Sequence, residues 1–339
     1  MVKTHEGRTS EHLNRMLRHG RCDSRLILVS NHYMKAYRIL FSRCIKFATA
    51  LFLMPFILSS CAEQKIAMRS LKENIDQELS RQEGTFAVAF KDLSTGKELL
   101  INDTVTFHAA STMKTPVLVE VYKQAAEGKF SLSDSLLIKN EFKSIVDGSP
   151  FSLDSTDDSE TELYKHIGEK RTISFLLYQM IIVSSNFSTN LIIELVNAKN
   201  VSATMQQLGA KDIHVLRGVE DGKAFDKGLN NTITAHGLMI LFEKIGKGET
   251  VNPAASKAMI DILLDQKFNE IIPAELPAGV KVAHKTGSIT GVHHDSGIIF
   301  LPNGKKYVLV LLSKNLKDEK AAIKAMAKIS KLIYEFVSR

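Results

Sequence analysis

A serine and a lysine three positions apart, Ser111 and Lys114, have the types and spacing of a nucleophile and its base. A helix is predicted over 111–127, so both side chains lie on one face of its first turn. A serine hydroxyl is a weak nucleophile, and a deprotonated lysine beside it can take its proton. The N–H groups at a helix start can stabilise a developing oxyanion. The competing interpretation is a simple cap at Ser111 with a solvated Lys114.

The second polar motif is Ser184-Ser185-Asn186, which follows a strongly apolar run. The Ser184 hydroxyl is suited to pass a proton to a leaving nitrogen. The Asn186 amide can hydrogen-bond both a lysine and a substrate amide. Taken alone, the motif also fits a polar turn between two helices, predicted over 173–183 and 188–196.

The third motif, Lys285-Thr286-Gly287-Ser288, lies at the end of a predicted strand. Lys285 offers a fixed cation and Thr286 a hydroxyl for a substrate carboxylate. Gly287 lets a ligand approach the backbone closely because it has no Cβ. The N–H of Ser288 can complete an oxyanion hole with that of Ser111. The competing interpretation is an ordinary strand end with a turn glycine.

The elements that must position these motifs follow from the apolar periodicity. Helices are predicted over 63–82 and 317–337, near the two ends of the body. Strands are predicted at 85–91, 97–102, 281–286, 296–301 and 306–313. A mainly helical block lies between the two groups of strands. We therefore predict an α+β fold: an antiparallel sheet flanked by N- and C-terminal helices, plus an all-helical lobe, with a cleft between them.

The net charge of +7 over 339 residues is concentrated at the N-terminus. Residues 1–60 contain ten basic and three acidic side chains, so 34 of each sign remain in 61–339. A body without net charge lacks the excess of basic residues that nucleic-acid binding requires, so we exclude nucleic acid as a partner. The other expected properties are a single body domain over 61–339 and a monomeric state.

Residues 1–60 are predicted to be a leader. The apolar run 47–58 follows several basic residues, the pattern of a secretory signal. It ends in Leu58-Ser59-Ser60-Cys61, which resembles a bacterial lipobox, in which the cysteine is acylated and becomes the new N-terminus. We expect an exported lipoprotein on the periplasmic side of a bacterial membrane, anchored through Cys61. A plain signal peptide or a signal anchor is the alternative. Met34 begins a leader of more usual length.

Metal ligands are sparse in the body. None of the three cysteines lies beyond Cys61, which excludes a disulfide or a cysteine-based metal site there. His284, His293, His294 and Asp295 surround the third motif but lack the spacing of a zinc-binding helix motif. Neighbouring histidines on a strand point to opposite faces. We therefore expect no metal and no cofactor.

The three motifs, in this order, resemble those of the penicillin-recognising serine enzymes, most closely the class A β-lactamase-type serine hydrolases. The resemblance covers roughly 65–338, and the separation of Ser184 from Lys285 is also similar. It implies a sheet with flanking helices, an all-helical lobe and a site between them. The longer gap between the first two motifs points to an insertion at the acidic stretch 154–162, interpreted as a solvated surface loop.

The resemblance implies a role for each motif residue. Ser111 is the nucleophile that becomes acylated, Lys114 is its proton partner, and Ser184 relays a proton to the leaving group. The residues implied to hold the substrate carboxylate and the oxyanion come from the third motif: Lys285, Thr286 and Ser288.

The sequence departs from the family pattern in two places. Ser185 stands where class A enzymes usually have aspartate. Those enzymes also carry a loop glutamate that activates the deacylating water, usually followed by a Leu-Asn pair. The matching stretch is 216–224, where Glu220 is near the expected place but the asparagine is absent. Asp221 is the competing base, and a solvated acidic loop is the plain alternative.

The function predicted from these residues is hydrolysis of a β-lactam amide through an acyl-enzyme on Ser111, with water activated by Glu220. A D-Ala-D-Ala carboxypeptidase, or another serine peptidase acting on peptidoglycan stem peptides, is the alternative, because an acyl-enzyme without a placed water persists. A non-catalytic cell-wall-binding protein is a third reading, less consistent with Lys114 beside Ser111.

Overall fold

Five antiparallel strands form the central sheet in the computed structural model, which describes residues 65–339 of the chain. From one edge to the other, the strands are β2 (Glu98–Ile101), β1 (Thr85–Asp92), β11 (Lys306–Lys314), β10 (Val292–Phe300) and β9 (Lys281–Ile289). Strand β1 pairs with β11 from the far end of the chain, with Ala89 opposite Val310. The two ends of the body therefore share one sheet, as the sequence predicts.

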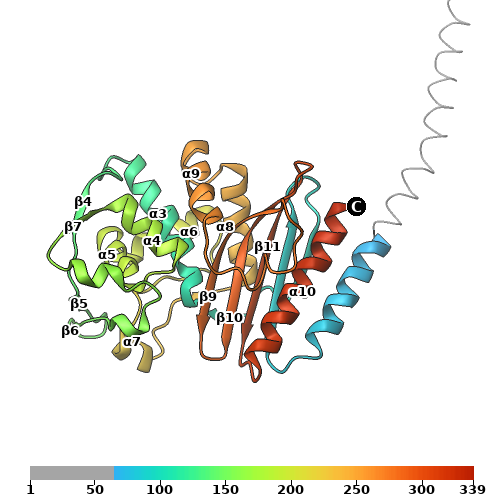
Figure 1. Ribbon diagram of the computed structural model, residues 1–339, viewed down its shortest axis with the longest axis horizontal. Helices are drawn as coiled ribbons and strands as arrows, with labels where there is room; N and C mark the ends of the chain where they lie inside the picture. The colour runs from blue at the N-terminus through green and yellow to red at the C-terminus, as the bar shows by residue number, and fades with distance from the viewer. Residues whose placement is uncertain (1–64) are drawn as a thin grey trace, which may run out of the picture. The chain divides into compact units, whose positions relative to one another are not determined.

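Both faces of this sheet are buried, because alternate residues of its central strands enter two separate cores. Val88 belongs to one core and the next residue, Ala89, to the other. A helix over residues 65–79 and α10 (Glu319–Ser338) cover the core that contains Val88 (Figure 1). Ile75 of the first helix is fully buried there.

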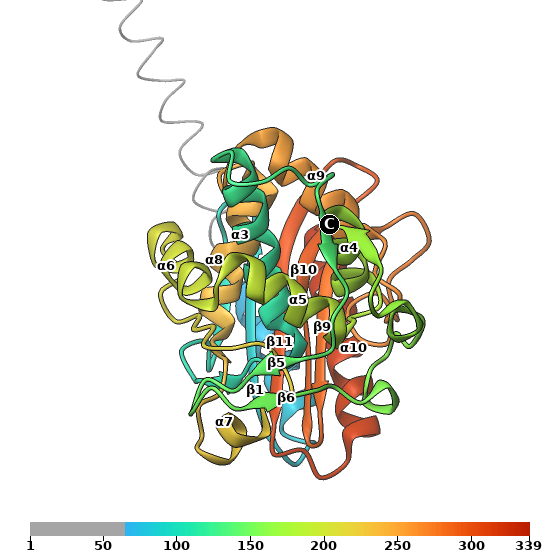
Figure 2. The same ribbon diagram turned by 90° about the vertical axis from the view of Figure 1, so that its left-hand side faces the viewer.

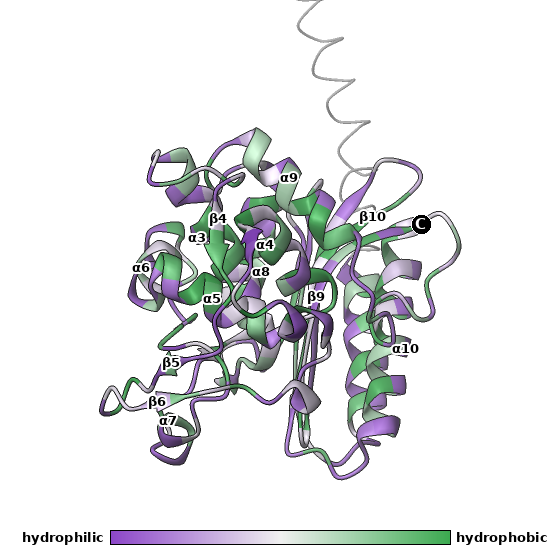
Figure 3. Cartoon of the chain, turned by 60° about the vertical axis from the view of Figure 1, so that its left-hand side comes forward, coloured by the Kyte–Doolittle hydropathy of each residue, from purple (hydrophilic) through white to green (hydrophobic). Residues whose placement is uncertain are grey.

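The opposite face carries the helical lobe, with α3, α4, α5 and α6 in front of the sheet in Figure 2. Its helices are α3 (Lys114–Ala126), α4 (Ile173–Ile182), α5 (Asn186–Val196), α6 (Ala198–Leu208), α7 (Gly222–Asp226), α8 (Ala235–Lys247) and α9 (Pro253–Leu264). Apolar residues are concentrated in α3, α4, α5 and α8, whereas α10 alternates apolar and polar sides (Figure 3). The lobe is thus built around its own apolar interior, which is continuous with the core on this face of the sheet.

Short strand pairs and 3-10 turns connect these helices. The pairs are β3 (Phe107–His108) with β8 (Thr232–Ile233), β4 (Ser135–Leu137) with β7 (Lys170–Thr172), and β5 (Phe142–Lys143) with β6 (Pro150–Phe151). The 3-10 turns are η1 (Ala110–Met113), η2 (Ser155–Asp157) and η3 (Glu162–His166). The predicted α+β class, with an antiparallel sheet, flanking helices and a helical lobe, is confirmed.

The boundaries predicted at the first and third motifs are wrong. The helix predicted from Ser111 begins instead at Lys114, and Ser111 lies in the 3-10 turn η1. Pro116 explains the difference, because in a helix starting at Ser111 its ring would clash with the carbonyl of Thr112. The third motif does not end its strand, since β9 continues to Ile289 before the turn into β10.

The predicted leader, from its expected start at Met34 to the expected lipidation site at Cys61, lies outside the described residues. Among the helices of residues 65–339, none is long and apolar enough to cross a membrane.

Candidate active site

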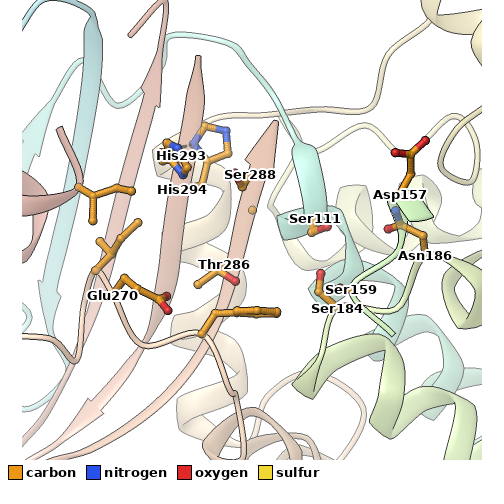
Figure 4. A pocket seen from close by; sticks show the side chains of 14 residues that line it. Ser111, Asp157, Ser159, Ser184, Asn186, Glu270, Thr286, Ser288, His293 and His294 are labelled. Atoms are coloured by element: carbon orange, nitrogen blue, oxygen red, sulfur yellow. Dashed lines mark hydrogen bonds between the residues drawn. The ribbon is translucent and has the colours of Figure 1, made fainter. Parts of the chain in front are cut away.

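Ser111 lies where the helical lobe meets the edge strand β9 (Figure 4). The preceding Ala110 has a φ of 43°, in the left-handed region that non-glycine residues rarely adopt. Thr112 fixes the turn by donating its hydroxyl to the Ala109 carbonyl over 2.6 Å. A Cβ on Gly287 of β9 would lie 3.0 Å from the backbone nitrogens of both Ser111 and Thr112. The glycine therefore permits the close contact between strand and turn.

Lys114 is fully buried one turn after Ser111. Its Nζ donates to the Ser184 carbonyl at 2.5 Å, the Ser184 hydroxyl at 3.1 Å and Asn186 Oδ1 at 2.9 Å. Burial lowers the pKa of Lys114 to about 7, although the negative charges of Asp158 and Glu220 oppose the shift. A substantial fraction of Lys114 is therefore neutral near pH 7 and able to accept a proton.

Ser184 joins two lysines. Its hydroxyl accepts from Lys114 Nζ and also from Lys285 Nζ, the latter over 3.0 Å. A hydroxyl has two acceptor positions and one proton, so both acceptor positions are used and the proton remains for another partner. The backbone of Ser184 has a φ of 58°, which turns the chain sharply between α4 and α5. These contacts place a donor hydroxyl at the cavity wall.

Lys285 is fully buried behind Ser184, whereas Thr286, Gly287 and Ser288 line the cavity. Its Nζ also donates to the Thr286 carbonyl over 2.9 Å. Burial, and then the nearby cation Lys114, lower the pKa of Lys285 well below its ordinary value. The third motif thus presents two hydroxyl side chains to the cavity with a lysine behind them.

Asn186 links the two candidate bases. Its Oδ1 accepts from Lys114 and its Nδ2 donates to Glu220 Oε1 over 2.6 Å. Burial raises the pKa of the Glu220 carboxyl, while the hydrogen bond from Asn186 opposes the increase. The backbone of Glu220 has a φ of 60°. The strained loop and the asparagine together hold this carboxylate beside the same cavity as Ser111.

Asp221, the competing base, is engaged in holding the loop. Its carboxylate accepts from the Ser144 hydroxyl at 2.9 Å, the Ile145 N–H at 2.9 Å and the Ala224 N–H at 3.1 Å. The last contact caps α7. The side chain is nearly inaccessible, and these bonds occupy both of its oxygens. Glu220 is therefore the better placed of the two carboxylates to contact a water.

Sequence reasoning missed the residues that support the Glu220 loop. Arg217 donates to the Leu229 and Gly218 carbonyls, and Asn190 donates to the Val219 carbonyl and accepts from its N–H. A Cβ on Gly218 would collide with the Asn190 side chain, so the loop packs closely on α5. The contacts of Arg217 with Leu229 and of Asn190 with Val219 join positions 12 and 29 residues apart, so residue type alone does not reveal them.

Two cavities meet at the nucleophile. The first, of about 430 Å³, is lined in part by Thr286, Glu270 and His293, and the second, of about 420 Å³, by Glu220 and Phe225. The residues that line both are Ser111, Asn186 and Ser288. Figure 4 shows Ser111 between β9 on one side and Ser184 with Asn186 on the other. A carbonyl bound at this junction would have Glu220 on one side and Thr286 on the other.

The interpretation of 154–162 as a solvated surface loop is wrong at its centre. Asp158 is buried, and its carboxylate accepts from the N–H groups of Asn186 at 3.0 Å and Phe187 at 2.8 Å. Its neighbours Asp157 and Ser159 line the first cavity. The apolar residues and helix start that surround Asp158 come from other segments, so its burial is not evident from an acidic run.

The histidines near the third motif all contact protein groups. His284 pairs with buried Asp295 over 2.8 Å, and His293 with Glu319 over 2.7 Å. His294 Nε2 lies 2.9 Å from the carbonyl oxygen of His108, and burial lowers the pKa of His294 to about 4. Within residues 65–339, no group of three or more His, Cys, Asp or Glu side chains is arranged to hold a metal ion.

Comparison with known proteins assigns this chain to a family. The model of the "Beta-lactamase enzyme family" matches residues 70–337. The chain belongs to this family. The extended-spectrum β-lactamase PER-1 of Pseudomonas aeruginosa is 24% identical over 276 residues, covering 78% of this chain and 87% of PER-1. The β-lactamase ROB-1 of Haemophilus influenzae is 25% identical over 251 residues, covering 73% of this chain and 76% of ROB-1.

A solved structure of PBP-A is 27% identical, with a TM-score of 0.69, and the match covers 79% of this chain and 96% of that structure. The predicted resemblance to class A serine hydrolases is confirmed, and the protein is a serine hydrolase of the class A β-lactamase type. The roles of the individual site residues remain predictions.

Proposed function

We propose that this protein hydrolyses β-lactam amides through an acyl-enzyme on Ser111. The observation that carries the proposal is the arrangement of two bases at one nucleophile. Lys114 is buried one turn after Ser111, Glu220 and Ser111 line the same cavity, and Asn186 hydrogen-bonds both bases. Acylation and deacylation each need a base, and the site contains one for each step.

In the acylation step, neutral Lys114 takes the Ser111 proton while Oγ attacks the lactam carbonyl carbon. The N–H groups of Ser111 and Ser288 stabilise the resulting oxyanion. The lactam C–N bond then breaks, and the Ser184 hydroxyl gives its proton to the departing nitrogen. The Lys114 ammonium, hydrogen-bonded to Ser184, restores that proton. Thr286, with Lys285 behind it, faces the substrate carboxylate.

In the deacylation step, Glu220 takes a proton from water as the water oxygen attacks the ester carbon. The ester C–O bond breaks, and the proton that Glu220 took from water passes to the Ser111 oxygen, which regenerates both the hydroxyl and the Glu220 carboxylate. The hydrogen bond from Asn186 fixes the direction of the Glu220 carboxylate. Because Asn186 also hydrogen-bonds Lys114, one side chain fixes the positions of both bases relative to each other.

A peptidase acting on D-Ala-D-Ala stem peptides is the second candidate, and the similarity to PBP-A is the observation that favours it. The carboxylate of Glu220 at the cavity and the relatives named β-lactamases favour hydrolysis of the β-lactam. A non-catalytic protein would have no physical use for burying Lys114 at the cost of its hydration.

Steady-state kinetics with benzylpenicillin and with an acyl-D-Ala-D-Ala peptide test this proposal. We expect turnover of the penicillin, loss of activity in Ser111→Ala, and little cleavage of the peptide. Cleavage of the peptide together with stoichiometric inhibition by penicillin would instead identify a peptidase.

We further propose that the mature protein is an exported monomer, anchored through lipid on Cys61. Support comes from the basic and apolar pattern that ends at Cys61, and from a site assembled within one chain. Incorporation of a labelled fatty acid by the wild type but not by Cys61→Ala is the expected result. Equal labelling of both would exclude the anchor, and light scattering of the soluble body tests the monomer.

A further inference from the structure

The start of α5 is held by a carboxylate from a different part of the chain. Asp158, just after η2, accepts from the backbone N–H groups of Asn186 and Phe187 and from the Tyr164 hydroxyl at 3.1 Å. These backbone donors are the unpaired groups at a helix N-terminus, where negative charge is stabilising. Only 7% of Asp158 is exposed, so its charge acts in a poorly solvated region.

The residues flanking this contact belong to the site. Asn186 is the first residue of α5 and contacts both Lys114 and Glu220. Ser159, next to Asp158, donates its hydroxyl to the Val183 carbonyl at 2.5 Å, immediately before Ser184. Two neighbouring residues of the acidic stretch therefore hold both sides of the second motif.

The helix start has no acid of its own. Ser185 is the N-cap of α5, and its hydroxyl accepts from the Ser188 N–H over 3.1 Å. Class A enzymes usually have aspartate at the position of Ser185. In this chain the carboxylate at the start of α5 comes instead from Asp158, 28 positions before Asn186.

We propose that Asp158 is a positioning residue of the acylation step: it fixes Asn186 at the start of α5 and stabilises the buried Lys114 ammonium. The inference rests on the proposed function and assigns part of the reaction to the acidic stretch. When Lys114 has taken the Ser111 proton, it is a cation with no access to bulk water. A fixed carboxylate nearby stabilises this state without an energetic cost of reorganising solvent.

The carboxylates that act on Lys114 come from two segments, Asp158 from the acidic stretch and Glu220 from its loop. The nearby cation of Lys114 in turn lowers the pKa of Lys285 on β9. Both carboxylates raise the pKa of Lys114 against the effect of burial. Removing the charge of Asp158 therefore lowers the pKa of Lys114. Because the neutral amine is the base, the acidic limb of the acylation profile moves to lower pH.

The test measures the acylation rate against pH for the wild-type body, Asp158→Asn, Asp158→Glu and Glu162→Gln. Glu162 is a matched control, since it is an exposed acid of the next turn, η3, paired with Lys165. We expect Asp158→Asn to lose tenfold to a hundredfold in maximal rate, about the effect of misplacing a catalytic group by up to 1 Å. Its acidic limb should also move to lower pH.

The glutamate variant separates charge from position. Asp158→Glu keeps the charge but moves the carboxylate by one methylene, so we expect a slower rate with the acidic limb unmoved. Because both variants are compared with Glu162→Gln, a general effect of the acidic stretch is excluded. If Asp158→Asn does not fold, Asp158→Glu still tests the proposal independently.

Three results would each contradict a different claim. Absence of acylation in the wild type would overturn the proposed function itself. If the wild type is acylated but both Asp158 variants have the acylation rate and the pH profile of Glu162→Gln, only the role of Asp158 is overturned. A Glu variant with the wild-type rate would likewise exclude positioning.

Discussion

The contact between β9 and the nucleophile turn predicts a specific defect in Gly287→Ala. The new Cβ would lie 3.0 Å from two backbone nitrogens, those of Ser111 and Thr112, where ordinary contact begins at 3.4 Å. Strand and turn must then separate by about 0.4 Å. Backbone cannot rotate away as a side chain does, so overpacking should destabilise the fold by about 1–3 kcal/mol.

The same displacement moves the two oxyanion donors apart, since one is on the turn and the other on β9. Misplacement by 1 Å is worth roughly a hundredfold in rate, so 0.4 Å should lower kcat/KM by about five- to tenfold. The assay is hydrolysis of a chromogenic cephalosporin, with thermal unfolding measured on the same samples.

Gly246→Ala is the matched control for this prediction. Its Cβ would also meet a neighbour at 3.0 Å, but that neighbour is the far end of the Leu93 side chain, with Ile298 next at 3.3 Å. Both side chains can adjust, and alanine is favoured over glycine by about 1 kcal/mol within a helix such as α8. We expect wild-type kcat/KM for this variant. Wild-type kcat/KM in Gly287→Ala would refute the reasoning about the turn.

Three other outcomes follow from the site. Acylation by the wild type should increase as pH rises through about 7, because Lys114 must lose its proton to act as a base; a rate independent of pH from 6 to 8 would exclude it. Ser184→Ala should slow acylation by about 10²–10⁴-fold in single-turnover measurements, since the leaving nitrogen loses its proton donor; a small effect would place the relay elsewhere. Asp221→Asn should lower the free energy of unfolding in urea by about 1.5–3 kcal/mol, because hydrogen bonds to a buried charge are lost. If this variant instead keeps its stability but no longer deacylates, Asp221 is the base.

The arrangement of sheet and lobe is predictable from the sequence because its signals are local. Short apolar runs mark the strands and helical spacing marks α10, and strands at both ends of the body need one another as partners. The polar motifs are recognisable because hydroxyl, amide and lysine side chains stand next to apolar runs. The delayed start of α3 was also available from Pro116, whose ring excludes a regular helix at Thr112.

The contacts that complete the site are not local. Asp158 resembles its acidic neighbours in type, and only the folded chain brings the start of α5 to it. Arg217 and Asn190 likewise act through carbonyls that every residue possesses. The position of Lys285 behind Ser184, instead of at the cavity wall, depends on the register of β9 against the lobe. These facts are set by packing between distant segments, which residue type does not encode.

The central claim is that Ser111 is acylated by a β-lactam and released by water that Glu220 activates. Intact-protein mass spectrometry of the wild type and Glu220→Gln, sampled over time after mixing with a penicillin, tests both steps. We expect a transient adduct on Ser111 in the wild type, followed by free enzyme and penicilloate, and a persistent adduct in Glu220→Gln. A persistent adduct in the wild type, no adduct on Ser111 in either protein, or equally fast loss from both would contradict the account.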